Sequence, residues 1–308
     1  MSAYRFCRTD DVALLVDALN CCWSPYFPGE PTMTPAAFKR TIRDLQIWCS
    51  SCMVAFSGSD PIGVLIGGKR PSGTLVHKIA VHPDHRRQGH GRHLLASLSS
   101  KLAILGPPRM IAEVPETLAP VCELFSASGY VQEAILTDYV LHPTAHTTRR
   151  GDPGQSADND PRELGFVIPV TVDDLAANGL LGPADPYPGV PAARPLRGGV
   201  EGCWERSVET LTARKDDIAG FAVASDERIE AYLLYAEAGG TEIMSLRSFI
   251  EDGGARLQQL LSRLHAQSMS AVRFPKVHPA EISRECLESL GFRPAGGHLL
   301  YAATARSA

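Results

Sequence analysis

The chain has 308 residues and a formal net charge of −4, and 44% of its residues are hydrophobic. This length is sufficient for two ordinary domains, and the hydrophobic content excludes a disordered chain. The charge balance gives no support to nucleic acid as a partner, and no apolar stretch approaches the roughly 18 residues of a membrane-spanning helix. The first residues lack the apolar segment of a signal peptide, so a cytoplasmic location is expected by default.

The first half of the chain alternates between helical and strand patterns. Helices are expected where apolar residues recur at helical spacing, and strands where short apolar runs end at turn residues. The expected elements are helices over 11–21, 34–45, 92–105 and 118–126, and strands over 52–56, 62–66, 74–81, 109–114 and 130–141.

The second half repeats this order after a segment of different composition. Residues 143–165 are rich in Pro, Gly, Ser, Thr, Asp and Asn, and we expect an exposed linker between a domain at 1–142 and a domain at 166–308. In the second domain, Leu290-Gly291-Phe292 stands where Ser128-Gly129-Tyr130 stands in the first. This correspondence indicates an internal duplication.

The junction between the strand over 74–81 and the following helix carries the most informative motif. Residues 81–91 read Val-His-Pro-Asp-His-Arg-Arg-Gln-Gly-His-Gly. Glycine allows a ligand to approach the backbone closely, and the first turn of a helix offers unpaired N–H groups at the positive end of its dipole. With Arg86 and Arg87 beside it, the segment predicts a pyrophosphate-binding loop, which a bulky residue at Gly89 or Gly91 would block.

Two other phosphate-binding loops fit this chain poorly. The segment from Gly63 to Lys69 has the glycine–lysine spacing of a P-loop, but Arg70 follows where Ser or Thr would bind magnesium. A dinucleotide-binding fingerprint needs a third glycine where Leu94 stands. Cys49 and Cys52 have a Cys-x-x-Cys spacing without a second pair or a thioredoxin-like context, so we expect buried thiols and no metal site.

The glycine loop and its flanks resemble the coenzyme A loop of the GNAT superfamily of N-acetyltransferases. The family pattern is Arg/Gln-x-x-Gly-x-Gly/Ala after a strand that ends in Val-x-Pro, and residues 81–91 are similar to it. The resemblance covers about residues 3–142, where residues 124–130 are also similar to the family's Leu-Tyr-x-x-x-Gly-Phe. It implies an α/β (mixed α+β) fold with two acetyltransferase-like domains, each a mixed, mostly antiparallel central sheet flanked by helices.

The two copies differ at the glycine loop. Residues 250–256 lack the arginine–glycine pattern, and Glu251 and Asp252 stand where a pyrophosphate would need positive charge. We therefore expect the second domain to keep the fold and to have lost the coenzyme site.

The resemblance implies acetyl-CoA as the cofactor of the first domain. The backbone at the end of the strand would pair with the pantetheine arm like an added strand, and the loop amides would hold the pyrophosphate. The residues assigned to the cofactor are Ile79, Ala80, Val81, Arg86, Arg87, Gln88, Gly89, His90, Gly91 and Arg92.

Two residues are candidates for the catalytic base. The ordinary pKa of a histidine is close to neutral, and His77 lies in a His-Lys-Ile-Ala-Val-His run similar to that of serotonin-type acetyltransferases. Glu113, on the next strand, is an alternative that would act through water. The general acid remains open, because Phe125 stands where the family often has a tyrosine; the substitutes considered are Ser126, Cys122 and Tyr130.

The acceptor is expected beside the aromatic loop that contains Trp23, Tyr26 and Phe27, whose rings suit stacking or cation–π contact with an amine. The expected function is the transfer of acetyl from acetyl-CoA to a primary amine of a small molecule or peptide. A non-catalytic or regulatory module that binds coenzyme A is the alternative. Neither nucleic acid nor a membrane is expected as a partner.

Overall fold

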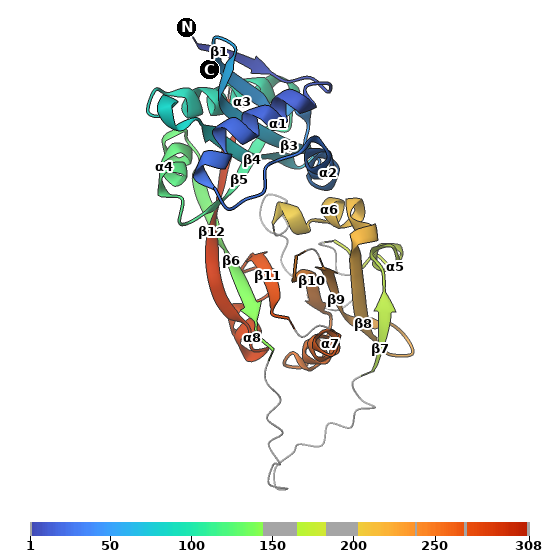
Figure 1. Cartoon of the computed structure of the whole chain (residues 1–308). Helices are drawn as coiled ribbons and strands as arrows, with labels where there is room; N and C mark the ends of the chain where they lie inside the picture. Colours follow the sequence, from blue (N-terminus) through green and yellow to red (C-terminus); the bar gives the residue numbers. More distant parts are fainter. Residues whose placement is uncertain (1, 144–164, 183–202, 238, 268–269, 307–308) are drawn as a thin grey trace. The chain divides into compact units, whose positions relative to one another are not determined.

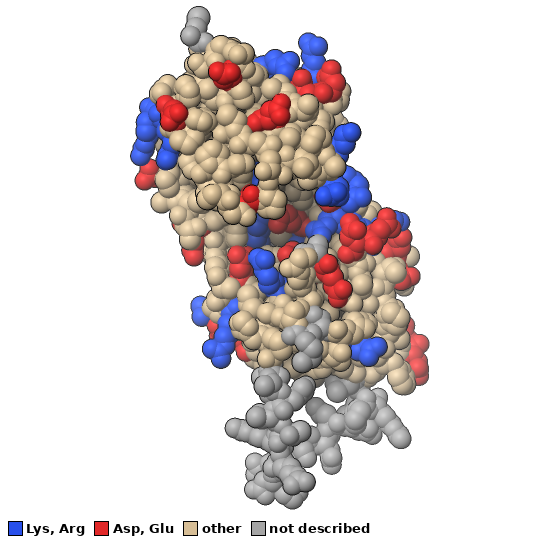
Figure 2. All heavy atoms as spheres, viewed as in Figure 1, with Lys and Arg blue, Asp and Glu red and all other residues tan. Residues whose placement is uncertain are grey.

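A computed structural model describes residues 2–143, 165–182, 203–237, 239–267 and 270–306 (Figure 1). The chain forms two compact units: Met1–Ile135 together with His298–Ala308, and Leu136–Gly297. Most of the expected linker, residues 144–164, lies outside the described residues. Lys/Arg and Asp/Glu side chains are interspersed on the face seen in Figure 2, in keeping with the small net charge.

Unit 1 is built on a mixed sheet with the strand order β1-β2-β3-β4-β5-β12-β6. Its strands are β1 (Ser2–Phe6), β2 (Met53–Ser57), β3 (Asp60–Arg70), β4 (Gly73–Val81), β5 (Arg109–Pro115), β6 (Val131–Leu141) and β12 (Arg293–Thr304). The helices are α1 (Val12–Cys22), α2 (Pro35–Leu45), α3 (His90–Leu105) and α4 (Ala119–Ala127), with 3-10 turns η1 (Ser24–Tyr26), η2 (Cys49–Ser51) and η3 (Pro83–His85).

The hydrophobic core of unit 1 holds the glycine loop in place. Leu94, Leu95 and Leu98 recur at helical spacing along α3 and are 0–1% exposed. They belong to one buried cluster with apolar residues of β2 to β5 and with Phe125 of α4. This burial fixes the first turn of α3 against the end of β4, because the apolar face of a helix has to be removed from water.

Unit 2 repeats the mixed sheet. Its strand order continues as β6-β11-β10-β9-β8-β7, with β7 (Phe166–Val170), β8 (Ile218–Ala224), β9 (Ile229–Glu237), β10 (Thr241–Ser248) and β11 (Val272–Val277). The helices are α5 (Val172–Ala177), α6 (Val208–Ala213), α7 (Ala255–His265) and α8 (Arg284–Ser289), with η4 (Trp204–Arg206) and η5 (Lys215–Asp217).

The duplication extends to the register of the strands. In each unit one parallel ladder is two residue pairs long: Thr74 and Leu75 of β4 pair with β5, and Thr241 and Glu242 of β10 pair with β11. After this ladder, β4 has one extra residue relative to its antiparallel neighbour β3, and β10 has one relative to β9. In both units the extra residue stands two positions after the last pair of the parallel ladder. This shared register confirms that the two halves have one fold.

The boundaries of the two units differ from those expected from the sequence. β12 begins in unit 2 and ends in unit 1, where His298 to Thr304 pair antiparallel with β5. β6 runs the other way, and its residues from Thr137 to Leu141 pair with β11 of unit 2. Each sheet therefore contains a strand segment from the other half of the sequence, which local pattern cannot reveal.

Among the described residues, no helix is long and apolar enough to cross a bilayer. All eight cysteines lie in the described part of the chain and are free thiols, and Cys49 and Cys52 are buried as expected.

Candidate functional site

The glycine loop has the backbone geometry of an anion cradle. Arg87 and Gly89 both adopt the left-handed region, with φ of 60° and 86°, and Gly89 is the N-cap of α3. The first turn of α3 has no side-chain cap, so its N–H groups remain directed outward at the positive end of the helix dipole. Arg86, Arg87 and Arg92 are all exposed beside this turn.

The strand that leads to the loop separates from its neighbour. The parallel ladder between β4 and β5 ends at Leu75 and Ile111, while β5 remains paired with β12 as far as Pro115. In the β3–β4 ladder, Gly67 pairs with Val76 and Ile66 pairs with Lys78, so His77 is the extra residue of a β-bulge. The edge of β4 that faces β5 is therefore open from the bulge to the glycine loop.

A cavity of about 550 Å³ lies along this open edge. Its wall is formed by the end of β4, the glycine loop, the first turn of α3, helix α4 and the aromatic loop after α1. It includes nine of the ten residues assigned to the cofactor, namely Ile79, Ala80, Val81, Arg86, Arg87, Gly89, His90, Gly91 and Arg92, and all three aromatic residues of the expected acceptor pocket. Gln88 is exposed on the loop outside this wall.

The two loop glycines have different roles. A Cβ at Gly89 would meet nothing within 4 Å, so this position is open to a ligand, and its positive φ favours glycine. A Cβ at Gly91 would lie 3.0 Å from Cδ2 of Leu124, so this glycine allows α3 and α4 to pack closely. A bulky residue at Gly91 would therefore disturb helix packing as well as ligand approach.

The aromatic loop is fixed by contacts within the protein. The Trp23 and Phe27 rings are stacked with centroids 4.5 Å apart, and Nζ of Lys78 lies 4.0 Å from the Trp23 ring. The Tyr26 hydroxyl donates to the Val81 carbonyl at 2.6 Å, which ties the loop to the end of β4. Because Lys78 already makes a cation–π contact with Trp23, an acceptor cation would have to share or displace this contact. The sequence did not indicate this role of Lys78.

The catalytic candidates lie next to the cavity's strands but outside its wall. His77 is half-buried in the bulge of β4, and Glu113 is half-buried on β5, where it pairs with Leu300 of β12. Neither is among the residues that wall the cavity. The roles assigned to them therefore remain predictions.

The position of the family's usual tyrosine belongs to the core. Phe125 is 1% exposed, and its ring packs edge-on against Tyr130 (4.9 Å) and parallel to Tyr301 of β12 (5.8 Å). Tyr130 is itself buried, with its hydroxyl 3.7 Å from Sδ of Met110, and burial raises its pKa. Neither Tyr130 nor the other substitutes, Ser126 and Cys122, is part of the cavity wall.

The sequence analysis missed several residues of the wall. Helix α4 supplies an apolar side with Leu118, Val121 and Leu124, and η3 supplies His85. The spacing of these three apolar residues, which start at the N-cap of α4, could have indicated a shared face, but such a face ordinarily turns toward a core. His85 lay within the recognised motif and was available as a candidate.

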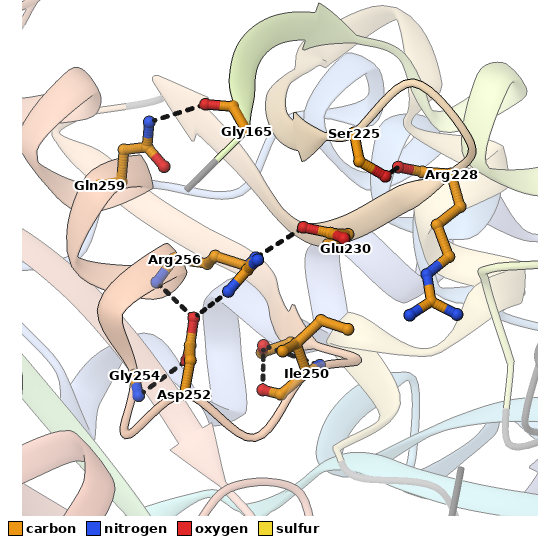
Figure 3. Close-up of polar contacts among 10 residues, drawn as sticks. Gly165, Ser225, Arg228, Glu230, Ile250, Asp252, Gly254, Arg256 and Gln259 are labelled. Atoms are coloured by element: carbon orange, nitrogen blue, oxygen red, sulfur yellow. Dashed lines mark hydrogen bonds and ion pairs between the residues drawn. The ribbon is translucent and has the colours of Figure 1, made fainter. Parts of the chain in front are cut away.

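In unit 2 the corresponding helix N-terminus is occupied by a side chain of the chain itself (Figure 3). Gly254, with φ of 90°, is the N-cap of α7, as Gly89 is of α3. The Asp252 carboxylate accepts from the backbone N–H groups of Gly254 (3.0 Å) and Arg256 (3.1 Å). The Arg256 side chain donates to Asp252 (2.8 Å) and to Glu230 (2.7 Å), and all three side chains are 12–13% exposed. A carboxylate thus fills the place of an anionic ligand.

This capping carboxylate predicts a pH-dependent stability of unit 2. Burial alone would raise the pKa of Asp252, but hydrogen bonds from Arg256 and Gly254 and the charge of Arg256 hold it below its ordinary value. The ionised Asp252 carboxylate therefore stabilises the fold of unit 2 above about pH 4, and this stabilisation is lost as the pH falls through the lowered pKa. We expect Asp252→Asn to destabilise unit 2 by about 1 kcal/mol at neutral pH, because its amide oxygen makes neutral hydrogen bonds in place of charge-assisted ones.

Urea unfolding of the wild type and of Asp252→Asn at a series of pH values measures this effect. The difference in unfolding free energy should shrink as the pH falls below about 4. Glu251→Gln, at the exposed neighbouring position, is the matched control and should follow the wild type. A constant difference at all pH values would contradict the assignment.

A mixed sheet that opens beside a glycine-rich helix N-terminus is a geometry that suits an extended ligand with an anionic end. Residues 14–130 match the acetyltransferase (GNAT) family. This match lies within unit 1, which carries the cavity, and the solved structures that follow show a similar fold over both units.

Solved structures of this superfamily cover both units. A tandem GNAT protein from the clavulanic acid biosynthesis pathway has a TM-score of 0.62 and 17% identity, with 100% of both chains covered. A GCN5-related N-acetyltransferase from Sphaerobacter thermophilus has a TM-score of 0.62 and 13% identity, over 99% of this chain and 96% of that chain. A GCN5-related N-acetyltransferase from Anabaena variabilis has a TM-score of 0.60 and 9% identity, over 99% of this chain and 73% of that chain. At these identities the likeness establishes the tandem fold.

Proposed function

We propose that unit 1 binds acetyl-CoA and transfers its acetyl group directly to a primary amine of a small molecule or a peptide. The observation that carries this proposal is the cavity along β4, which ends at an uncapped helix N-terminus. Members of the superfamily use acetyl-CoA as co-substrate, and this cavity suits its shape and charge. The open strand edge fits an extended amide-containing arm, and the first turn of α3 with Arg86, Arg87 and Arg92 fits a pyrophosphate.

Acetyl-CoA supplies the acetyl group as a thioester. The amine nitrogen forms a bond to the carbonyl carbon, and the carbon–sulfur bond breaks with its electron pair on sulfur. The amine must lose a proton, which His77 would accept directly or Glu113 would accept through water. Backbone N–H groups near the β4 bulge would polarise the carbonyl, and the sulfur would be protonated from solvent because Phe125 has no proton to give.

We propose one coenzyme site per chain. The Asp252 carboxylate occupies two backbone N–H groups at the start of α7, and Arg256 and Glu230 hold it there. A pyrophosphate would have to displace this carboxylate and would meet its negative charge. The β10 residue that corresponds to His77 is Met244, the extra residue of the second bulge, which cannot act as a base.

A second candidate function is a regulatory module that binds coenzyme A without transfer. The buried position of Phe125 favours it, since the substitutes named for a tyrosine acid, Ser126, Cys122 and Tyr130, all lie outside the cavity wall. Both candidates require coenzyme binding in unit 1, and they differ only in turnover.

Release of free thiol from acetyl-CoA in the presence of a panel of amines separates the two candidates. Transfer predicts thiol release that depends on both an amine and the enzyme, together with the N-acetylated amine detected by mass spectrometry. Tight coenzyme binding without thiol release across small amines, amino acids and peptides would support the regulatory module.

A further inference from the structure

The aromatic loop after α1 is bonded to the end of β4 by one side chain. The Tyr26 hydroxyl donates to the Val81 carbonyl at 2.6 Å, and both residues belong to the cavity wall. Partial burial raises the pKa of Tyr26, so the hydroxyl keeps its proton at neutral pH and acts as the donor. Whether this bond obstructs a ligand depends on the edge of β4 to which the Val81 carbonyl points.

The Val81 carbonyl points to the open edge of β4. The N–H of His82, the next residue, donates to the Ile62 carbonyl of β3 at 2.9 Å, and Val81 is paired with Gly63 of the same strand. Neighbouring residues of an antiparallel strand direct their N–H and C=O groups to opposite edges. The backbone groups of His82 therefore face β3, and those of Val81 face the edge that β5 leaves open.

Tyr26 therefore occupies a group that an added strand would need. The same alternation directs the backbone groups of Ile79 to the open edge, so an amide-containing arm that pairs with β4 would use the N–H and C=O groups of Ile79 and Val81. Of these, the Val81 carbonyl already accepts the Tyr26 hydroxyl. An amide of the arm would have to lie within hydrogen-bond distance of the same oxygen, where the hydroxyl already lies. The arm and Tyr26 thus compete for one position.

We propose that Tyr26 is an autoinhibitory latch, whose hydroxyl holds the Val81 carbonyl until the pantetheine arm of the coenzyme displaces it. This inference rests on the coenzyme site proposed for unit 1 and adds a regulation of that site. The latch lowers coenzyme affinity, because only the unlatched fraction of the protein can pair with the arm. Since Tyr26 lies in the same loop as Trp23 and Phe27, its release also changes the wall of the expected acceptor pocket.

Calorimetric titration of full-length Tyr26→Phe with coenzyme A tests the latch. The guanidinium carbon of Arg86 lies 5.6 Å from the centre of the Tyr26 ring, and a phenylalanine ring can keep this contact, so the substitution removes only the hydroxyl. We expect Tyr26→Phe to bind coenzyme A about two- to tenfold more tightly than the wild type, the size of one neutral hydrogen bond. A tyrosine whose hydroxyl contacts the ligand would instead lose affinity when it is replaced.

Two controls separate the latch from a general effect of the substitution. The first is the phosphoadenosine diphosphate that remains when the pantetheine arm is removed from coenzyme A. It has no group to pair with β4, so it should bind Tyr26→Phe and the wild type equally. The second is Tyr235→Phe, which deletes a tyrosine hydroxyl that donates to Gln267 of unit 2 at 3.1 Å and should bind coenzyme A like the wild type. Thermal unfolding of each variant establishes that it is folded.

The outcomes distinguish a failure of the latch from a failure of the proposed function. If the wild type binds coenzyme A and Tyr26→Phe binds it no more tightly, the latch is absent and the proposed function stands. The same conclusion follows if Tyr26→Phe gains equally for coenzyme A and for the phosphoadenosine diphosphate, because the arm is then not the competitor. If neither the wild type nor Tyr26→Phe binds coenzyme A, the inference and the proposed function fail together.

Discussion

Replacing Arg86 and Arg87 together by glutamate is expected to weaken coenzyme A binding by about a hundredfold or more, because two charge-assisted contacts become repulsive. Both side chains are exposed, so the substitution leaves the core of unit 1 intact. The effect should shrink as salt is added, since exposed charges are screened. Calorimetric titration at low and high ionic strength measures the affinity and its salt dependence.

Arg40→Glu provides the matched control for this charge reversal. Arg40 is exposed on α2 and does not belong to the cavity wall. The Arg40→Glu substitution makes the net charge of unit 1 more negative, as the double substitution does. It therefore shows any general effect of this charge on coenzyme affinity. Equal affinities for the double variant and the Arg40 variant would show that the glycine loop does not hold the phosphates.

His77→Ala is expected to lower amine acetylation by about a hundredfold at neutral pH, the usual size of a general-base contribution. The bulge places His77 at the point where β4 leaves β5, away from the loop that holds the phosphates. Coenzyme affinity should therefore be nearly unchanged. Steady-state rates and calorimetric affinities of the same preparation separate the two effects.

The pH profile distinguishes a base from a structural residue at this position. If His77 accepts the amine proton, kcat/KM of the wild type should fall below the pKa of an imidazole, and His77→Ala should lose this limb. Glu113→Gln is the parallel variant for the alternative base. A rate within about twofold of the wild type for His77→Ala would assign the proton to Glu113 or to water.

Local sequence patterns were sufficient to predict the helices and strands that form the candidate site. The glycine loop has a defined strand–turn–helix context, so its motif predicted the start of α3 at the end of β4. Thr34 followed by proline predicted the start of α2, where the Thr34 hydroxyl accepts from the N–H of Ala37 at 3.1 Å. The repeated order of elements, with Leu290-Gly291-Phe292 at the place of Ser128-Gly129-Tyr130, predicted the duplication. The signals for α2 and α3 lie within a few residues, where propensity and capping act.

Contacts between distant residues could not be predicted in this way. The pairing of β12 with β5 joins residues nearly two hundred positions apart, and no local pattern distinguishes it from a strand that stays in its own half. The hydrogen bond between Tyr4 and His90 joins β1 to α3, and only the folded chain brings them together. Glu251 and Asp252 were expected to repel a pyrophosphate, but only the structure shows Asp252 as the cap of α7.

The central claim is that unit 1 holds one coenzyme at the glycine loop and that Asp252 closes the equivalent place in unit 2. Calorimetric titration of the full-length protein with acetyl-CoA tests it most directly, because the stoichiometry counts open sites. We expect one acetyl-CoA per chain, and we expect the Arg86→Glu, Arg87→Glu variant to lose this binding. A stoichiometry of two, or binding that survives the loss of both arginines, would contradict it.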